Sequence, residues 1–212
     1  MKMTSSDTLE LLEKLEENME NKSGENNSHW FLHSKCVGDS AAIIAEHLGL
    51  DIDKARVLGY IHDIGVPLGE YIDHVMNGYN YIKELGFGEE YANICLTHSF
   101  LNNDVNCTAG GIPRKNPFLE EFIKNHEYNI YEKIINLCDL MCTSENITVE
   151  ERLEDLKARK GIHENTAYHE NETMKLKELF DNLIGFDIYC LFWKTKKITS
   201  KKTKTLSVFG FD

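Results

Sequence analysis

The sequence lacks a hydrophobic run long enough to cross a lipid bilayer. A membrane-spanning helix needs about 20 consecutive apolar residues, and the best candidate, residues 186–193, is far shorter. The first residues also lack an apolar signal segment, because the chain turns acidic and amphipathic soon after Met1. These absences predict a cytoplasmic protein with no membrane partner.

Closely spaced cysteine pairs are missing as well. The chain has six cysteines and no Cys-x-x-Cys pair, although Cys138 and Cys142 lie four residues apart on one predicted helix face. A zinc knuckle would need a second closely spaced pair. We therefore expect reduced cysteines that pack as small hydrophobic side chains.

Positive charge is scarce outside one segment. The formal net charge is −12, which disfavours binding along a nucleic-acid backbone. Residues 194–204 contain six lysines and no acidic residue, so the rest of the chain is still more acidic. This lysine-rich run could contact an anionic ligand or surface, although such runs are more often solvated. The composition predicts no nucleic-acid partner.

Apolar residues recur at helical spacing almost everywhere before residue 185. A chain of 212 residues is expected to build one well-buried core, and no repeat or linker announces a second domain. We predict an all-α bundle over residues 1–185 and a tail over residues 186–212. Within the tail, the β-prone segments 188–193 and 205–209 could pair as a ribbon. Helices are expected around residues 9–15, 28–48, 51–61, 70–85, 89–100, 130–142, 148–160 and 172–184, with a lid or substrate wall in the long loop 102–116.

The adjacent pair His62-Asp63 ends an apolar helix just before Ile64-Gly65. Neighbouring residues differ by about 100° around a helix, so the two side chains can contact one metal from adjacent positions. The carboxylate of Asp63 has two oxygens and can bridge two ions. Taken alone, the pair could equally be a helix C-terminus, with His62 facing the helix dipole and Asp63 capping a turn.

Four further residues strengthen the metal interpretation. His33 lies one turn into a long helix, His98 ends another, and His74 lies on a helix with Gly78 one turn later. The missing side chain of Gly78 would let another group approach closely. Asp139 is a carboxylate on an otherwise apolar helix, and a buried carboxylate is costly unless a cation or hydrogen-bond donors compensate it. A metal ion would provide that compensation.

The order and spacing of these residues resemble the HD-domain superfamily of metal-dependent phosphohydrolases over roughly residues 29–145. The resemblance implies a helical bundle that holds one or two divalent metal ions. The usual ions are Fe, Mn, Mg, Co, Ni or Zn, and nitrogen-rich ligands favour the transition metals over Mg. The resemblance assigns His33, His62, Asp63 and Asp139 to a first metal site, and Asp63, His74 and His98 to a second.

Two positions depart from the pattern of the superfamily. Many members have Lys directly after the Gly and use it to reach the substrate phosphate, whereas this chain has Val66-Pro67. Many also have a second His after the position of His98, where this chain has Ser99. The phosphate contact must therefore come from elsewhere or be absent, and the second metal could be weak or completed by water.

Basic residues elsewhere are candidates for gripping a substrate phosphate. We select Arg152, Arg114 and Lys115, and we interpret Lys157 and Arg159 as part of a solvated helix face. The remaining histidines carry less weight. His29 could orient His33 or lie on the surface, and we interpret His47, His126, His163 and His169 as ordinary.

The expected reaction is hydrolysis of a phosphoester or phosphoanhydride of a small molecule, with nucleotides as the favoured class. A hydroxide activated by the metal ions would attack phosphorus, with Asp63 and His62 as the central catalytic residues. Two alternatives stay open. A di-iron oxygenase could use the same ligands, and the missing Lys after Gly65 would suit a ligand-binding module without turnover. Such a module would have no chemical reason to keep the complete ligand set.

Overall fold

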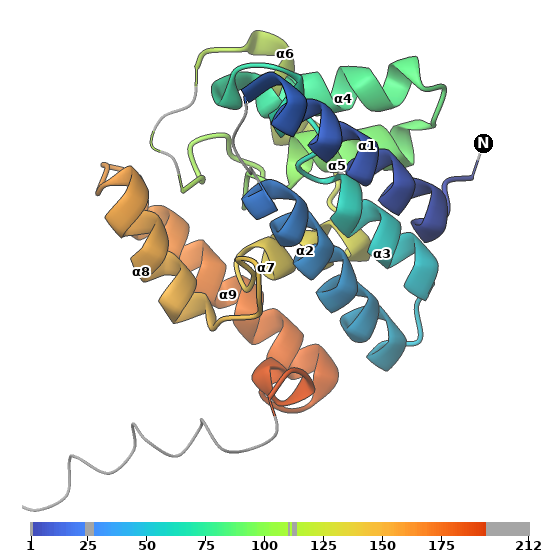
Figure 1. Ribbon diagram of the computed structural model, residues 1–212. Coiled ribbons are helices and arrows are strands. Elements are labelled where there is room, and N and C mark those ends of the chain that lie inside the picture. Colours follow the sequence, from blue (N-terminus) through green and yellow to red (C-terminus); the bar gives the residue numbers. More distant parts are fainter. Residues whose placement is uncertain (1, 24–27, 110, 112–113, 194–212) are drawn as a thin grey trace, which may run out of the picture.

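The computed structural model describes residues 2–23, 28–109, 111 and 114–193, and all regular structure in these ranges is helical (Figure 1). This confirms the all-α prediction, and no described helix has both the length and the apolar character of a membrane span. The α-helices are α1 (Ser5–Ser23), α2 (Ser28–His47), α3 (Ile52–Ile61), α4 (His74–Glu84), α5 (Glu89–Thr97), α6 (Pro117–Asn125), α7 (Ile130–Asp139), α8 (Val149–Lys160) and α9 (Thr166–Ile184). Three short 3₁₀ helices are η1 (Val66–Leu68), η2 (Tyr71–Asp73) and η3 (Ile188–Leu191).

Local capping chemistry accounts for several helix starts. A capping box begins α8, because the Thr148 side chain accepts from Glu151 N while the Glu151 side chain accepts from Thr148 N. The sequence reading misses α6, although Pro117 at its first position and the Asn116 cap, which accepts from Leu119 N, are the signals that mark its start.

The predicted C-terminal ribbon is wrong in its first segment. Ile188–Leu191 forms η3, which begins where the Asp187 side chain accepts from Tyr189 N. Ile188 and Tyr189 are buried against the main core, so burial and the cap override the β-propensity of these residues. The second segment, residues 205–209, lies outside the described residues, and the division of the chain at residue 185 stays a prediction.

The centre of the bundle is the pair α2 and α3, which lie side by side (Figure 1). Helix α7 packs against both of them, α1 covers α3, and α4 pairs with α5. Helices α8 and α9 form a second pair on the other side of α7 (Figure 1). Fully buried side chains from α1, α2, α3, α7 and α9 meet in one core, and they include Leu12, Ile44, Leu58, Ile134 and Phe180.

Two glycines allow α2 and α3 to touch through their backbones. A Cβ atom placed on Gly59 of α3 would lie 2.4 Å from the Cα atom of Gly38 on α2. No side chain fits at that distance, so the close crossing of the two helices requires glycine on α3. Because His33 and His62 lie about one turn from this crossing, the contact brings these two side chains to the same place.

We predict that Gly59→Ala lowers the free energy of unfolding by about 1–3 kcal/mol, because the added methyl group must push α3 away from Gly38. Chemical denaturation followed by circular dichroism measures the change. The matched control is Gly88→Ala, since a Cβ atom at Gly88 meets nothing within 4 Å. Equal unfolding midpoints for the two variants would show that the crossing is not tightly packed.

Candidate metal centre

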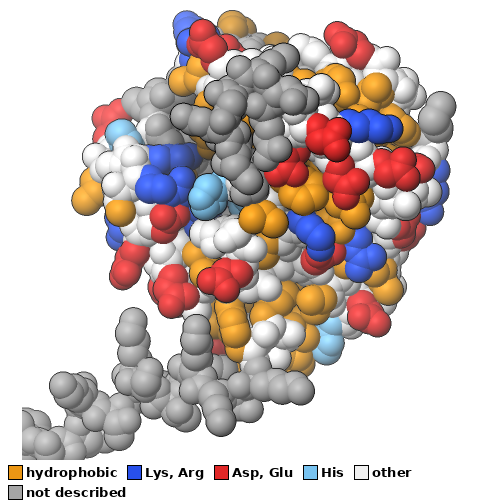
Figure 2. Space-filling model, viewed as in Figure 1, with side chains coloured by type: hydrophobic (Ala, Val, Ile, Leu, Met, Phe, Trp, Pro, Cys, Tyr) orange, Lys and Arg blue, Asp and Glu red, His pale blue; other side chains and the backbone are white. Residues whose placement is uncertain are grey.

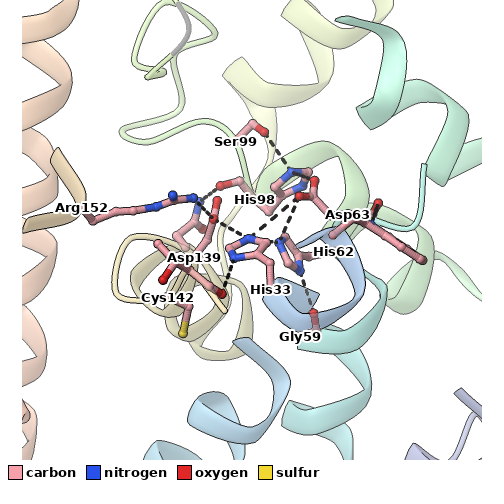
Figure 3. Close-up of polar contacts among 12 residues, drawn as sticks. His33, Gly59, His62, Asp63, His98, Ser99, Asp139, Cys142 and Arg152 are labelled. Atoms are coloured by element: carbon pink, nitrogen blue, oxygen red, sulfur yellow. Dashed lines mark hydrogen bonds and ion pairs between the residues drawn. The ribbon is translucent and has the colours of Figure 1, made fainter. Parts of the chain in front are cut away.

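The six side chains predicted as metal ligands converge at one place in the bundle, and Figure 3 shows most of them. They form two groups, and within each group the possible ligand atoms all lie within 4.8 Å of one another. Five helices therefore contribute to a single cluster. His33 lies on α2, His62 and Asp63 follow α3, His74 begins α4, His98 follows α5, and Asp139 ends α7.

The first group contains His33, His62 and Asp139. The Nε2 atom of His33 lies 3.1 Å from Oδ1 of Asp139 and 3.3 Å from Nε2 of His62. Nitrogen and oxygen ligands lie about 2 Å from a divalent transition metal, so ligands of one ion are separated by about 3–4 Å. These three side chains have the spacing that one ion requires.

The second group contains Asp63, His74 and His98. Oδ1 of Asp63 lies 3.4 Å from Nε2 of His74 and 3.1 Å from Nε2 of His98. The other oxygen of Asp63, Oδ2, lies 3.6 Å from Nε2 of His62 and 4.0 Å from Nε2 of His33. Asp63 therefore directs one oxygen toward each group, which is the arrangement of a carboxylate that can bridge two ions.

Backbone carbonyls hold all four imidazole rings through their Nδ1 atoms. A carbonyl oxygen can only accept a hydrogen bond, so each Nδ1 carries the proton. In a neutral ring Nε2 then presents a lone pair, and all four lone pairs point into the cluster. The acceptors are Gly59 O for His62 at 2.6 Å, Tyr71 O for His74 at 2.6 Å, Ile94 O for His98 at 3.2 Å and Thr143 O for His33 at 3.3 Å.

The chemistry of this cluster fits metal ions. Neutral rings with Nε2 lone pairs 3.3 Å apart cannot hydrogen-bond to each other, as in the pairs His33–His62 and His74–His98. The lone pairs also face carboxylate oxygens of Asp63 and Asp139, which cannot donate when ionised. A cation in each group would convert these repulsions into coordination, and the nitrogen-rich donor set favours transition metals.

The pKa values of the rings differ with their carboxylate neighbours. Burial opposes protonation of His33, yet the hydrogen bond and charge of Asp139 raise the pKa of His33 above its ordinary value. In the same way, the hydrogen bond to Asp63 raises the pKa of His98 against the effect of burial. Burial instead lowers the pKa of His62 to about 4, so this ring is neutral at neutral pH.

Hydrogen bonds from two residues outside this set of six hold the backbone of the cluster in place. Trp30 donates from Nε1 to the backbone oxygen of Asp63 at 2.7 Å. Asn136 donates to the backbone oxygens of His98 at 2.8 Å and Thr97 at 3.0 Å, and so ties the end of α5 to α7. The sequence reading misses Asn136, although its position one turn before Asp139 on α7 is a signal for a role near the centre.

The expected close approach at Gly78 is confirmed. A Cβ atom on Gly78 would lie 3.2 Å from the backbone nitrogen of Gly65, and one on Gly65 would lie 1.9 Å from the backbone oxygen of His74. The loop that follows Asp63 therefore rests directly on the backbone of α4. This contact brings His74 beside Asp63.

Five of the six convergent side chains line a cavity of about 550 Å³, and they are His33, Asp63, His74, His98 and Asp139. The cavity is also lined by residues of α8, including Arg152, Arg159 and Lys160, and by Tyr71 of η2 and His169 of α9. Figure 2 shows basic side chains gathered over the C-terminal end of α8. The part of the cavity wall that α8 forms therefore carries positive charge, in the same cavity as the His and Asp side chains.

The structure separates the three predicted substrate contacts. Arg152 lines the cavity, and its Nη2 lies 3.6 Å from Oδ1 of Asp139 (Figure 3). Arg114 instead pairs with Asp73 at 3.1 Å and is mostly exposed, and neither Arg114 nor Lys115 lines this cavity. Their role in substrate binding stays a prediction.

The sequence does not identify several residues that line the cavity. The cavity is lined by Arg159, for which the sequence predicts a solvated face, by His169, for which it predicts no special role, and by Lys160. The available signal is spacing, since residues 152, 155, 156, 159 and 160 fall on one face of α8. His29, the candidate for orienting His33, also lines the cavity, but the ring of His33 is held by the backbone of Thr143.

An all-helical bundle with two adjoining His/Asp groups defines a class of metal-binding helical proteins. Residues 30–142, more than half of the chain, match the HD domain, and the chain belongs to this family. The match begins on α2 and ends just after α7, so it contains all six convergent side chains.

Similarity to curated proteins is confined to a short segment. Ribonuclease Y of Pseudothermotoga lettingae is 35% identical over 68 residues, which is 31% of this chain and 13% of that protein. Ribonuclease Y of Fervidobacterium nodosum is 34% identical over 68 residues, with the same coverage. Ribonuclease Y 2 of Bdellovibrio bacteriovorus is 32% identical over 72 residues, which is 33% of this chain and 14% of that protein. No solved structure shows significant similarity to the chain.

The two groups predict that metal stoichiometry changes in steps. Protein loaded with Mn²⁺ and then dialysed should lose about one equivalent of metal in His74→Gln, about one in Asp139→Asn and nearly all in Asp63→Ala. Elemental analysis by mass spectrometry measures the content. His47→Gln, on the exposed end of α2, is the control and should match the unchanged protein. Full metal content in all three ligand variants would rule out this centre.

The pKa directions predict a pH dependence of metal affinity. Protons compete with metal for Nε2, and the raised pKa values of His33 and His98 move this competition toward neutral pH. Affinity is fully present above these pKa values and is lost as the pH falls through them. Calorimetric titration with Mn²⁺ should show binding weakening by at least about tenfold between about pH 8 and about pH 6. Constant affinity across this range would contradict the assignment of these rings as ligands.

Proposed function

We propose that this protein is a metal-dependent phosphohydrolase that cleaves a phosphoester or phosphoanhydride of a small molecule, with nucleotides as the favoured substrate class. The observation that carries the proposal is the position of Asp63, which directs one oxygen toward each of the two groups of convergent side chains at the floor of a cavity. A carboxylate shared in this way suits two adjoining cations, a common centre for phosphoryl chemistry.

His33, His62 and Asp139 would hold one ion, His74 and His98 the other, and Asp63 would be shared. Divalent ions in such a centre, when bound, lower the pKa of water toward neutrality and neutralise phosphoryl charge. His62 is fully buried and does not line the cavity, so it is suited to holding an ion and not to exchanging protons with a substrate.

The wall formed by α8 would bind and orient the substrate. Arg152 presents a guanidinium group beside Asp139, where it can contact an anionic substrate that approaches the ligands. A second carboxylate, Asp155, holds Arg152 at 3.0 Å and keeps it in place. Preorganised cations of this kind stabilise charge that develops on phosphoryl oxygens during hydrolysis.

The size of the cavity and the charge of the chain support the proposed substrate class. A cavity of about 550 Å³ is within the range of small-molecule sites and is large enough for a nucleotide. The net charge of −12 disfavours a long nucleic-acid partner. The named relatives are ribonucleases, yet they share only a short segment with this chain, so an RNA oligonucleotide belongs in the substrate panel as a competing outcome.

We predict that the Mn²⁺-loaded protein hydrolyses at least one compound in a panel of nucleoside mono-, di- and triphosphates, dinucleoside polyphosphates and simple phosphomonoesters. Phosphate release and chromatography measure the reaction. Asp63→Ala should lower kcat/KM by about 1000-fold or more, because it removes the carboxylate common to both groups. His47→Gln is the control and should keep the activity of the unchanged protein.

The same assay separates the alternatives. The hydrolase works under argon and tolerates Mn²⁺, whereas an oxygenase with these ligands consumes oxygen and requires iron. Cleavage of RNA without cleavage of small molecules would replace the proposed substrate class. Binding of panel compounds without turnover under any metal would favour a ligand-binding module and overturn the proposal.

A further inference from the structure

Three basic residues of α8 line the metal cavity, and they differ in how they are neutralised. Arg152 pairs with Asp155 at 3.0 Å and approaches Asp139 at 3.6 Å. Arg159 pairs with the same Asp155 at 2.7 Å. Lys160 lines the same cavity and forms no ion pair with a carboxylate in the described part of the chain. The wall therefore presents one cation whose charge has no direct partner.

An aromatic ring holds the ammonium group of Lys160 in position. Its Nζ atom lies 5.4 Å from the centroid of the Tyr71 ring and 3.5 Å from the Tyr71 hydroxyl oxygen. Such a contact is a weak cation–π interaction that orients a lysine without neutralising it. Burial of the ammonium group lowers the pKa of Lys160 from its ordinary value, because less water is left to solvate the charge. An anion bound in the cavity would stabilise the charged form of Lys160 by electrostatic attraction.

Tyr71 also connects this ammonium group to the metal centre. Its backbone oxygen accepts the hydrogen bond from Nδ1 of His74 at 2.6 Å. Its ring stacks on the His74 imidazole, with centroids 4.8 Å apart and planes 16° from parallel. Lys160 is thus placed one aromatic ring away from a ligand of the second group, on the side that faces the cavity.

A purely structural role accounts less well for Lys160. Lysines are common in the last turn of a helix, where they can interact with free carbonyl groups. Here Gly161 N already donates to Lys157 O at the end of α8, and the ring of His163 donates to the backbone oxygen of Lys160 at 2.7 Å. The ammonium group meanwhile lies over the ring of Tyr71 in η2.

We infer that Lys160 binds a phosphoryl oxygen of the substrate, and that Tyr71 positions it to do so. The loop after Gly65 offers no cation for this purpose, because it consists of Val66, Pro67 and Leu68. The ligand class is a phosphate group with at least two ionised oxygens, which can contact the metal centre and the ammonium group together. This inference rests on the proposed function, since it assigns a substrate contact at the same site.

The test is binding of inorganic phosphate to the Mn²⁺-loaded protein, measured by isothermal titration calorimetry. Lys160→Met keeps the apolar stem and removes the charge, and we expect it to weaken phosphate binding by about 10- to 100-fold with metal content unchanged. Lys160→Arg should retain part of the affinity. Lys157→Met is the matched control, because Lys157 lies on the same helix, pairs with Glu170 and does not line the cavity, so its affinity should equal that of the unchanged protein.

Two results would overturn the inference: wild-type affinity in Lys160→Met, or no phosphate binding by the unchanged protein. Phosphate binding that depends on Lys160, in a protein that hydrolyses nothing in the panel, would sustain the inference and defeat the proposed function. With a hydrolysed substrate, Lys160→Met should raise KM and lower kcat, whereas a purely structural role would lower metal content and the free energy of unfolding instead.

Discussion

The main physical constraint on this structure is that it holds imidazole nitrogens and carboxylate oxygens, which repel one another, close together in one small cluster. Imidazole nitrogens with free lone pairs face one another and face carboxylate oxygens, and backbone carbonyls fix the rings so that they cannot turn away. Protons relieve part of the conflict, which is why His33 and His98 have raised pKa values, and the Ser99 hydroxyl lies 2.9 Å from Nε2 of His98, where it can donate a hydrogen bond. The apolar packing of the bundle must therefore supply the stability that offsets this repulsion.

The packing that opposes this conflict comes from close helix crossings. Gly38 and Gly59 let α2 and α3 meet at the backbone, and Gly65 lets the following loop rest on α4. Asn136 then fastens the end of α5 to α7. Each crossing lies within about one turn of a convergent side chain, so the small residues that allow these crossings also position the side chains of the cluster. The basic wall of α8 completes the site from outside this core.

The sequence predicts the ligands better than it predicts the cavity wall. His33, His62-Asp63, His74, His98 and Asp139 are recognisable because their order and spacing resemble those of the HD-domain superfamily. Lys160 is not recognisable, since its direction depends on how α8 packs against α9 and on the ring of Tyr71. The ribbon prediction at residues 188–193 is wrong because the main core buries Ile188, a long-range effect that local propensity does not contain.

The ring of His33 is held by the carbonyl of Thr143, which lies 110 positions further along the chain. During translation, therefore, the first group cannot exist until α7 and the residues after it have left the ribosome. The pairing of α2 and α3 does not depend on this group, because it rests on apolar packing and on the contacts of Asp39 on α2 with Tyr60 and Arg56 on α3. An ion that His33, His62 and Asp139 would hold is therefore selected by a nearly complete scaffold.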